Sequence, residues 1–472
     1  MIANPLAPSW LEAPADANAL ADGVWPANAV RSSDGELMVA GVAASALVAE
    51  FGTPLQVLDE ADVRARASGI RTAFESAFAA IGSRVTVYYA GKAFLSAAVA
   101  RWMQEEGLAI DVASGGELSV ALAAGIEPAR LGFHGNNKSA SEIERAVRAG
   151  VGVIILDSGT EIEHVARAAA AHGLTQAVRL RVNTGVHAHT HEYLATARED
   201  QKFGVPLAEV GAHAERIRSF ASLDFRGLHS HIGSQIFDVG GFVEAIGRLL
   251  PIHATLLESG PVPELNLGGG FGIAYTSADR VTPIGSMAVE LATAVAREAA
   301  RHGIPVPDIA IEPGRAIIGP AGVTLYTVGT IKDVEVAVPS GLAMRRYVSV
   351  DGGMSDNVRP ALYGADYSTR IANRSSQAEP VLVRVVGKHC ESGDILVHAD
   401  YLPGDAAPGD LLAVAATGAY CWSLASNYNY LPRPVVVVVA DGAARAIVRR
   451  ETEEDLLGRD LALVPSDVGE RR

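Results

Sequence analysis

The sequence predicts an α/β protein in which a barrel of eight parallel strands is joined to a second, all-β domain. Three observations predict this architecture. Between residues 85 and 315, short apolar runs alternate with alanine-rich segments of helical period, as in repeated strand–helix units. Beyond residue 320, strand-like runs continue but the long helical period is absent. The length of 472 residues exceeds one ordinary core, which fits a barrel with a partner domain.

Eight apolar runs supply the expected barrel strands, at residues 85–90, 108–113, 130–135, 151–157, 177–182, 225–232, 264–269 and 308–313. The segments between them carry apolar residues at positions i, i+3 and i+4, and several end in a glycine that can terminate a helix, such as Gly150 and Gly303. Eight such units predict a TIM (β/α)8 barrel over residues 54–320.

The flanking regions are expected to form the second domain. Residues 321–472 are interpreted as the C-terminal β domain, in which the run PVVVVVA has the length and β-branched content of a buried strand. Residues 1–53 are assigned to the same domain, because the run GELMVAG at 35–41 could pair with the late strands.

Composition narrows the class of function. Lys and Arg number 39 against 54 for Asp and Glu, and the net charge of −15 argues against nucleic acid or an anionic membrane as partner. No apolar run approaches the ~20 residues of a membrane-spanning helix, and the first thirty residues do not resemble a secretory signal. The two cysteines, Cys390 and Cys421, have no zinc-binding spacing and form no disulfide framework. We therefore expect a cytoplasmic protein that acts on a small molecule.

Polar residues gather at the expected carboxyl ends of the barrel strands, where TIM-barrel enzymes place their active sites. They are Lys92 after the first strand, Asp111 at the second, His134 at the third, His229, His231 and Ser234 at the sixth, and Glu312, Gly314 and Arg315 at the eighth. A solvated surface loop would explain any one of them. Their agreement across most strands indicates an active site.

The seventh strand leads into the glycine run Gly268, Gly269 and Gly270. This run is not interpreted as a dinucleotide fingerprint, because it does not open the first strand–helix unit of a nucleotide fold. Loops after strands seven and eight of a barrel commonly bind phosphate, so we predict a phosphate site with Arg315. A tight turn is the alternative, and it explains one or two of the glycines.

Lys92 closes an apolar strand, which would direct its amine into the barrel mouth. Desolvation there favours the uncharged, nucleophilic amine; the alternative is a solvated loop lysine. An amine nucleophile, a phosphate site and the Glu312 carboxylate together indicate pyridoxal phosphate (PLP), whose ring accepts electrons when an acid keeps its nitrogen protonated.

Eight motifs carry a family resemblance, namely YYAGKAF, DVASGGEL, GFHGNNKS, HSHIGSQ, LNLGGGFG, EPGRA, CESGD and SNYNYLPRP. In this order, and over nearly the whole chain, they resemble the fold-type III PLP decarboxylases and, within them, the diaminopimelate decarboxylase family. The resemblance implies a PLP-binding barrel, a second β domain and a homodimer whose active sites are completed across the interface. It implies conversion of meso-2,6-diaminopimelate to L-lysine and CO2, the last step of lysine biosynthesis.

The resemblance also implies roles for individual residues. Lys92 would hold the cofactor covalently, His231 would stack on its ring, and Glu312 would contact the ring nitrogen. The remaining implied cofactor contacts are Asp111, Ser234, Gly268, Gly269, Gly270, Gly314, Arg315 and Tyr420. The implied substrate contacts are Arg315, Arg359, Tyr363 and Tyr420, with Glu391 at the distal amino group and Cys390 as proton donor. Whether Arg315 serves the phosphate or a substrate carboxylate stays open.

At two segments, the chemistry of the side chains agrees with the roles that the resemblance implies. The segment RPALY, residues 359–363, offers a guanidinium and a phenol to a carboxylate, and CESGD pairs a thiol with an acid. A related decarboxylase acting on ornithine, arginine or carboxynorspermidine is the alternative, but it leaves RPALY harder to explain. A non-catalytic PLP-binding homologue would not need Lys92.

Three histidines at alternate positions, His187, His189 and His191, could line one face of a strand as metal ligands. We interpret the segment as a family loop without a metal role, and we expect no metal site.

Overall fold

The computed structural model describes residues 4–186 and 202–463. The chain forms two compact units. The barrel unit comprises residues 64–273 and 280–317, and the β unit comprises residues 1–63, 274–279 and 318–472.

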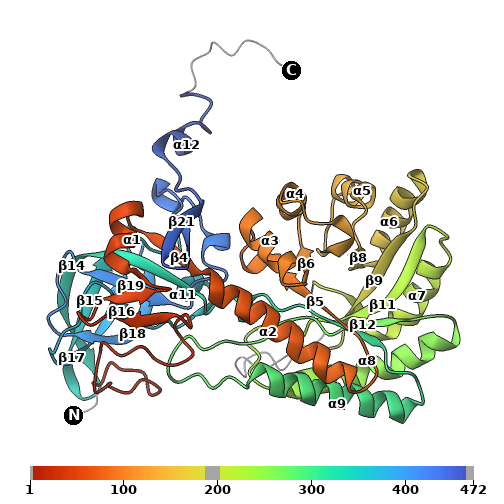
Figure 1. Ribbon diagram of the computed structural model, residues 1–472, viewed down its shortest axis with the longest axis horizontal. Helices are drawn as coiled ribbons and strands as arrows, with labels where there is room; N and C mark the ends of the chain where they lie inside the picture. Colours follow the sequence, from red (N-terminus) through yellow and green to blue (C-terminus); the bar gives the residue numbers. More distant parts are fainter. Residues whose placement is uncertain (1–3, 187–201, 464–472) are drawn as a thin grey trace. The chain divides into compact units, whose positions relative to one another are not determined.

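The barrel unit contains a closed barrel of eight parallel strands, as predicted (Figure 1). The strands follow the order β9-β11-β12-β13-β5-β6-β7-β8, and β8 pairs with β9 to close the ring. They are β5 (Val85–Ala90), β6 (Ala109–Val112), β7 (Leu131–Phe133), β8 (Val153–Leu156), β9 (Gln176–Asn183), β11 (Leu223–His229), β12 (Glu264–Asn266) and β13 (Asp308–Ile311). A short strand, β10 (Val205–Pro206), extends the pairing beyond β9.

Helices follow the barrel strands and cover their outer side (Figure 1). They are α3 (Ala97–Glu105), α4 (Gly115–Ala123), α5 (Ala140–Ala149), α6 (Gly159–Ala171), α7 (Val210–Arg218), α8 (Gly240–Glu258) and α9 (Ile284–His302). The short helix α10 (Arg315–Ile318) follows β13 directly. Helix α5 begins with a capping box between Ser139 and Glu142. Gly150 and Gly303 end α5 and α9 in the left-handed conformation, as the sequence predicted.

The barrel interior is closed by side chains. Tyr88, Ala109, Val153, Ile155 and Ala310 form an apolar layer from four different strands. At this level the barrel interior is therefore a packed core.

The β unit is organised around a sheet with the order β18-β17-β15-β14-β4-β20-β21, and β14 also pairs with β19, which pairs with β16. Its strands are β4 (Leu55–Asp59), β14 (Gly322–Val338), β15 (Gly341–Val350), β16 (Thr369–Ile371), β17 (Pro380–Val386), β18 (Ile395–Pro403), β19 (Leu411–Ala415), β20 (Val435–Ala440) and β21 (Ala443–Val448). Short helices α1 (Ala44–Phe51), α11 (Arg359–Tyr363) and α12 (Glu453–Leu457) belong to this unit, and α2 (Glu60–Ala79) leads into the barrel unit. The run PVVVVVA is β20, a buried strand as predicted.

The β unit takes its first long strand from the start of the segment that the sequence assigned to the barrel. Strand β4 lies between β14 and β20, with Leu58 opposite Gly322 and Val57 opposite Val437. The pattern could not reveal this, because a short run that is apolar on both faces suits a barrel strand and a central sheet strand equally. The run at 35–41 forms β2 (Leu37–Val39) in a separate small sheet with β1 (Ala29–Arg31) and β3 (Val42–Ala43).

Within the described residues, the structure contains no helix of the length and apolar character needed to cross a membrane.

We predict that Leu58→Ala lowers the free energy of unfolding by about 2–5 kcal/mol, the usual cost of emptying a buried leucine site. Leu58 in β4 is fully buried, whereas Val30 is 55% exposed and provides a control in Val30→Ala. Urea denaturation followed by tryptophan fluorescence measures both variants. Equal stability of the two variants would contradict the burial of β4.

Candidate active site

Four titratable side chains from four strand ends form a buried cluster at the barrel mouth. His134, which follows β7, places Nε2 3.3 Å from Asp111 Oδ1 and 3.3 Å from Glu312 Oε1. His229, the last residue of β11, places Nε2 3.0 Å from the same Glu312 oxygen. The two imidazole rings meet edge to face, with centroids 5.1 Å apart. The structure thus brings together Asp111 and Glu312, which the sequence nominated, with two histidines to which it gave no role.

Burial and mutual attraction set the charges of this cluster. Burial alone would lower the pKa of His134, but the attraction of Asp111 and Glu312 outweighs it and raises that pKa to about 9. Burial lowers the pKa of His229 to about 4, so this ring is neutral near pH 7. Burial also raises the pKa of Asp111 to about 6, against the attraction of His134. His134 is therefore the cationic member of the cluster.

Glu312 is an ionised carboxylate although its side chain is only 9% exposed. Burial would raise its pKa, but the contacts with His229 and His134 hold the pKa well below its usual range. Asn266 Nδ2 donates a hydrogen bond to Glu312 Oε1 at 2.8 Å. A buried anion of this kind is suited to hold a proton on a basic ring nitrogen.

Lys92 and His231 lie near one another at the same end of the barrel. Lys92 is in a 3-10 turn directly after β5 and is exposed to solvent, so the structure does not show the desolvated amine that the sequence predicted. Burial, with the nearby charge of Lys92, holds the pKa of His231 well below its ordinary value, so its ring is neutral. His231 Nδ1 accepts a hydrogen bond from Gly269 N–H at 3.3 Å.

The glycine run after β12 is tightly packed. A Cβ at Gly268, Gly269 or Gly270 would lie between 2.0 and 2.4 Å from a backbone carbonyl oxygen. Close packing therefore accounts for all three glycines, more than the one or two that a tight turn was expected to explain. The glycines alone therefore do not indicate a phosphate site, which must be argued from the hydrogen-bond donors of the loop.

Donors for an anion are present beside this run. The N–H groups of Gly268 and Gly269 already have acceptors, Asn266 Oδ1 and His231 Nδ1. The Gly270 N–H has no acceptor among the residues that the structure describes. Arg315 Nη2 donates to Ser234 Oγ at 2.9 Å, which joins the loops after β13 and β11.

These groups fit PLP. Both carboxylate oxygens of Asp111, both ring nitrogens of His229 and the Ser230 hydroxyl are buried without hydrogen-bond partners in the described part of the chain. Such atoms are rare in folded proteins and indicate a place prepared for a polar ligand. Lys92 supplies an amine, and Glu312 supplies a partner for a ring nitrogen. The region around Gly270 and Arg315 supplies hydrogen-bond donors for a phosphate.

The β unit holds Arg359 in an apolar and aromatic environment. Its guanidinium, 5% exposed, lies over the rings of Tyr275 and Tyr367, and Nη1 donates to Tyr367 Oη at 2.5 Å. No carboxylate pairs with Arg359 among residues 4–186 and 202–463. Tyr363, at the other end of α11, is 67% exposed and does not share this environment. The structure therefore does not bring the two ends of RPALY together.

The loop from Gly387 to Asp394 presents Cys390 and Glu391 to solvent. Asp394 holds the loop, since its carboxylate accepts from His389 N–H at 2.8 Å and Met354 N–H at 2.6 Å. Hydrogen bonds from Gly393 N–H and the Ser392 hydroxyl lower the pKa of Glu391.

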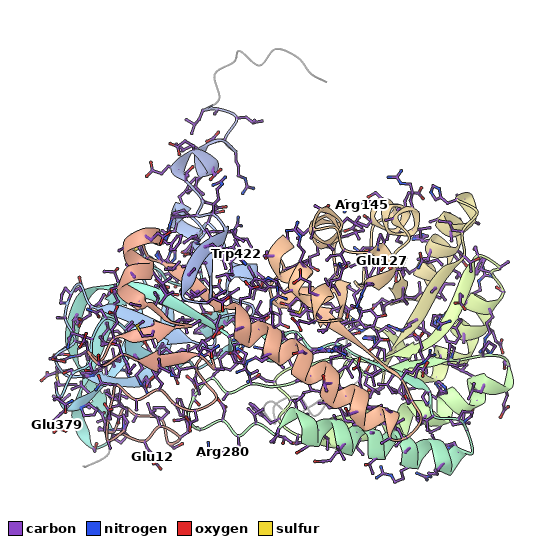
Figure 2. All side chains as sticks on the ribbon, viewed as in Figure 1. Glu12, Glu127, Arg145, Arg280, Glu379 and Trp422 are labelled. Atoms are coloured by element: carbon purple, nitrogen blue, oxygen red, sulfur yellow. The ribbon has the colours of Figure 1, made fainter. Side chains whose placement is uncertain are left out.

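Tyr420 has a left-handed backbone, with φ of 63°, and is half-buried. The segment after it contains Trp422, which is labelled in Figure 2. Trp422 Nε1 donates a hydrogen bond to Pro434 O at 3.0 Å.

Sequence reasoning missed the roles of His134, His229 and Asn266. Their positions at the ends of β7, β11 and β12 were the available signal, because inward-facing polar residues at barrel strand ends meet at the mouth. The histidines His187, His189 and His191 lie outside the described residues.

Comparison with known proteins identifies relatives. Residues 61–319 match the family described as "Pyridoxal-dependent decarboxylase, pyridoxal binding domain". The chain is 52% identical over 450 residues to a diaminopimelate decarboxylase of Mycobacterium tuberculosis, covering 94% of this chain and 98% of the relative. It is 44% identical over 435 residues to a diaminopimelate decarboxylase of Bacillus subtilis, covering 91% and 96%.

Solved structures show the same similarity. The crystal structure of diaminopimelate decarboxylase from M. jannaschii in complex with L-lysine has a TM-score of 0.83 and 29% identity, covering 93% of this chain and 98% of that one. A lysine/ornithine decarboxylase of Vibrio vulnificus complexed with putrescine shares the fold, with a TM-score of 0.68 and 22% identity over 84% and 97% of the chains.

The buried, neutral His229 predicts a pH dependence of stability. Its pKa of about 4 lies below the ordinary 6.5 of an unfolded histidine, so below pH 6.5 the unfolded chain takes up a proton that the folded chain refuses. The free energy of unfolding should fall as the pH falls from 6.5 towards 4, by about 3 kcal/mol at most. The slope of urea midpoint against pH should be shallower in His229→Gln and unchanged in His302→Gln, at the end of α9. An unchanged slope in His229→Gln contradicts a buried neutral ring.

Proposed function

The chain belongs to the pyridoxal-dependent decarboxylase family, and we propose that it is a carboxy-lyase that converts meso-diaminopimelate to L-lysine and CO2. The observation that carries the proposal is the 52% identity to a diaminopimelate decarboxylase of Mycobacterium tuberculosis over nearly the full length of both chains. The buried cluster at the barrel mouth supplies the physical support.

Lys92, at the end of β5, would hold PLP through its amine until the substrate amine takes its place. When bound, PLP supplies an electron sink for the bonding electrons that remain when the α-carboxylate leaves as CO2. Exposure of Lys92 keeps its amine accessible to both partners of the exchange.

Glu312 would hold the proton on the ring nitrogen, because its carboxylate stays ionised in a buried site. His231 would lie against the ring. Its neutral state suits this role, since a flat uncharged imidazole stacks without adding a second buried charge. The hydrogen bond from Gly269 N–H to Nδ1 fixes the tautomer with the proton on Nε2.

The phosphate group would be held by the Gly270 N–H and by the linked side chains of Ser234 and Arg315. Backbone amides and a guanidinium are strong donors to phosphate oxygens. Because Arg315 is fixed by Ser234, we assign it to the phosphate side of the site, and we assign Asp111 and Gly314 to the rim around the ring.

Arg359 favours a substrate with a second carboxylate. A buried guanidinium without an acidic partner is costly, and a substrate carboxylate would supply the missing anion. Diaminopimelate carries such a group at its distal end and ornithine does not. Glu391 would bind the distal ammonium, Tyr363 and Tyr420 would border the substrate, and Cys390 would deliver a proton from Sγ to the α-carbon.

We further propose that the enzyme is a homodimer in which Cys390 and Glu391 serve the barrel of the partner. Both are exposed in the β unit, so they are available to a second chain. Large apolar side chains are exposed in the same unit at Leu362, Tyr363, Leu424, Tyr428 and Tyr430. Exposed aromatic side chains are enriched at protein interfaces, which supports this proposal. Cys390 and Cys421 are both thiols and not a disulfide, which suits the reducing cytoplasm.

Lys92→Ala should abolish CO2 release from diaminopimelate, because no other amine replaces the one at the end of β5. Lys332→Ala, at an exposed lysine of the β unit, is the matched control and should retain full activity. Radiolabelled CO2 release from purified variants measures the effect. Full activity in Lys92→Ala would contradict the assignment of the nucleophile.

The shared site predicts complementation. Lys92→Ala and Glu391→Ala are each expected to be inactive, but a reassociated mixture should recover about a quarter of wild-type activity, since half the dimers are mixed and each of these has one intact site. Activity after dissociation and reassociation of the mixture measures this.

The control is a mixture in which subunit exchange is verified by mass spectrometry of differently tagged chains. Verified heterodimers without activity would show that Glu391 serves its own chain or has no role.

A further inference from the structure

We propose that His134 is a positioning residue for this reaction, a fixed imidazolium between two carboxylates that keeps Glu312 ionised for the ring nitrogen of the cofactor. The inference rests on the proposed function, because it concerns how Glu312 serves PLP. His134 contacts Glu312 and would act on the cofactor only through that carboxylate.

The geometry makes His134 the common neighbour of both anions. Its Nε2 lies 3.3 Å from Asp111 Oδ1 and 3.3 Å from Glu312 Oε1, and all three side chains are nearly buried. Neither contact has the alignment of a hydrogen bond. The attraction is therefore chiefly Coulombic, which does not require alignment and acts on both carboxylates at once.

Without a cation between them, two buried carboxylates this close would not both ionise. The usual result is that the pair shares a proton, with one pKa strongly raised. If Glu312 were the protonated member of the pair, it would carry no negative charge. It could then not stabilise a protonated ring nitrogen. His134 removes this conflict by separating the two negative charges with a positive one.

The other charged groups near the cluster do not replace His134. His229 touches Glu312 at 3.0 Å but is neutral, with a pKa of about 4. Arg181 of β9 interacts electrostatically with Glu312, but more strongly with Asp157, with which it forms an ion pair at 3.8 Å. The remaining charges are Arg179, which attracts Asp111, and Glu117 of α4, which lies near His134 and Lys92. Among the described residues, His134 is the one cation within ion-pair distance of Glu312.

The chain holds His134 firmly. Its backbone N–H donates to Val112 O at 2.8 Å at the end of β6. The loop that follows is pinned by buried Lys138, which donates to Gly135 O at 2.8 Å and pairs with Glu161 at 2.9 Å. These contacts hold the backbone that carries the His134 ring.

The test compares the affinity of the full-length apoprotein for two ligands, PLP and 1-deaza-PLP, in which carbon replaces the ring nitrogen. His134→Gln should weaken PLP binding about tenfold, equivalent to about 1.4 kcal/mol, and leave 1-deaza-PLP binding unchanged. Glu312→Gln should show the same selective loss, and His134→Gln should add nothing to it. His172→Gln, a histidine substitution elsewhere in the barrel unit, should bind both ligands as the wild type does.

An equal loss of both ligands in His134→Gln would show a merely structural role and overturn the inference, as would no loss at all. A second measurement needs no ligand: the His134 ring should titrate near pH 9 by NMR in the apoprotein, and lower in Asp111→Asn. Titration near 6.5 contradicts the inference. A wild-type protein that binds neither ligand contradicts the proposed function instead, so the two failures are distinguishable.

Discussion

The barrel mouth depends on one constraint: the nearly buried carboxylate of Glu312 must remain charged. Glu312 meets it with a histidine cation, a neutral histidine and the Asn266 amide, which come from three different strand ends. No single loop could supply this set. Closure of the barrel by the β8–β9 pairing is what brings β7, β11, β12 and β13 around one point. Fold and site are thus linked by electrostatics, because an open sheet would separate His134, after β7, from Glu312, after β13.

The same constraint explains why the charged and neutral groups of the site are kept apart. His134 and His229 have the same chemistry and nearly the same burial, but only His134 lies between two acids. Their pKa values move in opposite directions for that reason. His231, which would meet the cofactor ring, is also kept uncharged. The described cluster therefore carries its charges on His134 and Glu312, whereas the rings of His229 and His231 are neutral.

Much of this could be predicted from the sequence, because strand–helix alternation has a strong periodic signal and barrel topology fixes where strand ends meet. All eight barrel strands were located, and Lys92, Asp111, His231 and Glu312 lie at or just after strand ends, while their roles stay predictions. What could not be predicted depends on pairing and packing. Strand β4 has the same local pattern as a barrel strand, and nothing in RPALY shows that Arg359 turns inward while Tyr363 turns out. The partners of Glu312 are visible only when distant strand ends are adjacent.

The packing of Gly269 has a wider consequence. With a Cβ position only 2.0 Å from the Glu312 carbonyl oxygen, and Glu312 N–H bonded to Gly268 O at 2.9 Å, the two strand ends behave as one rigid piece. Under the proposed function, one side of this piece grips the phosphate and the other meets the ring nitrogen. The distance between the phosphate-binding groups and the Glu312 carboxylate would therefore be fixed. A ligand would then be selected by the distance between its phosphate and its ring nitrogen, independently of its charge.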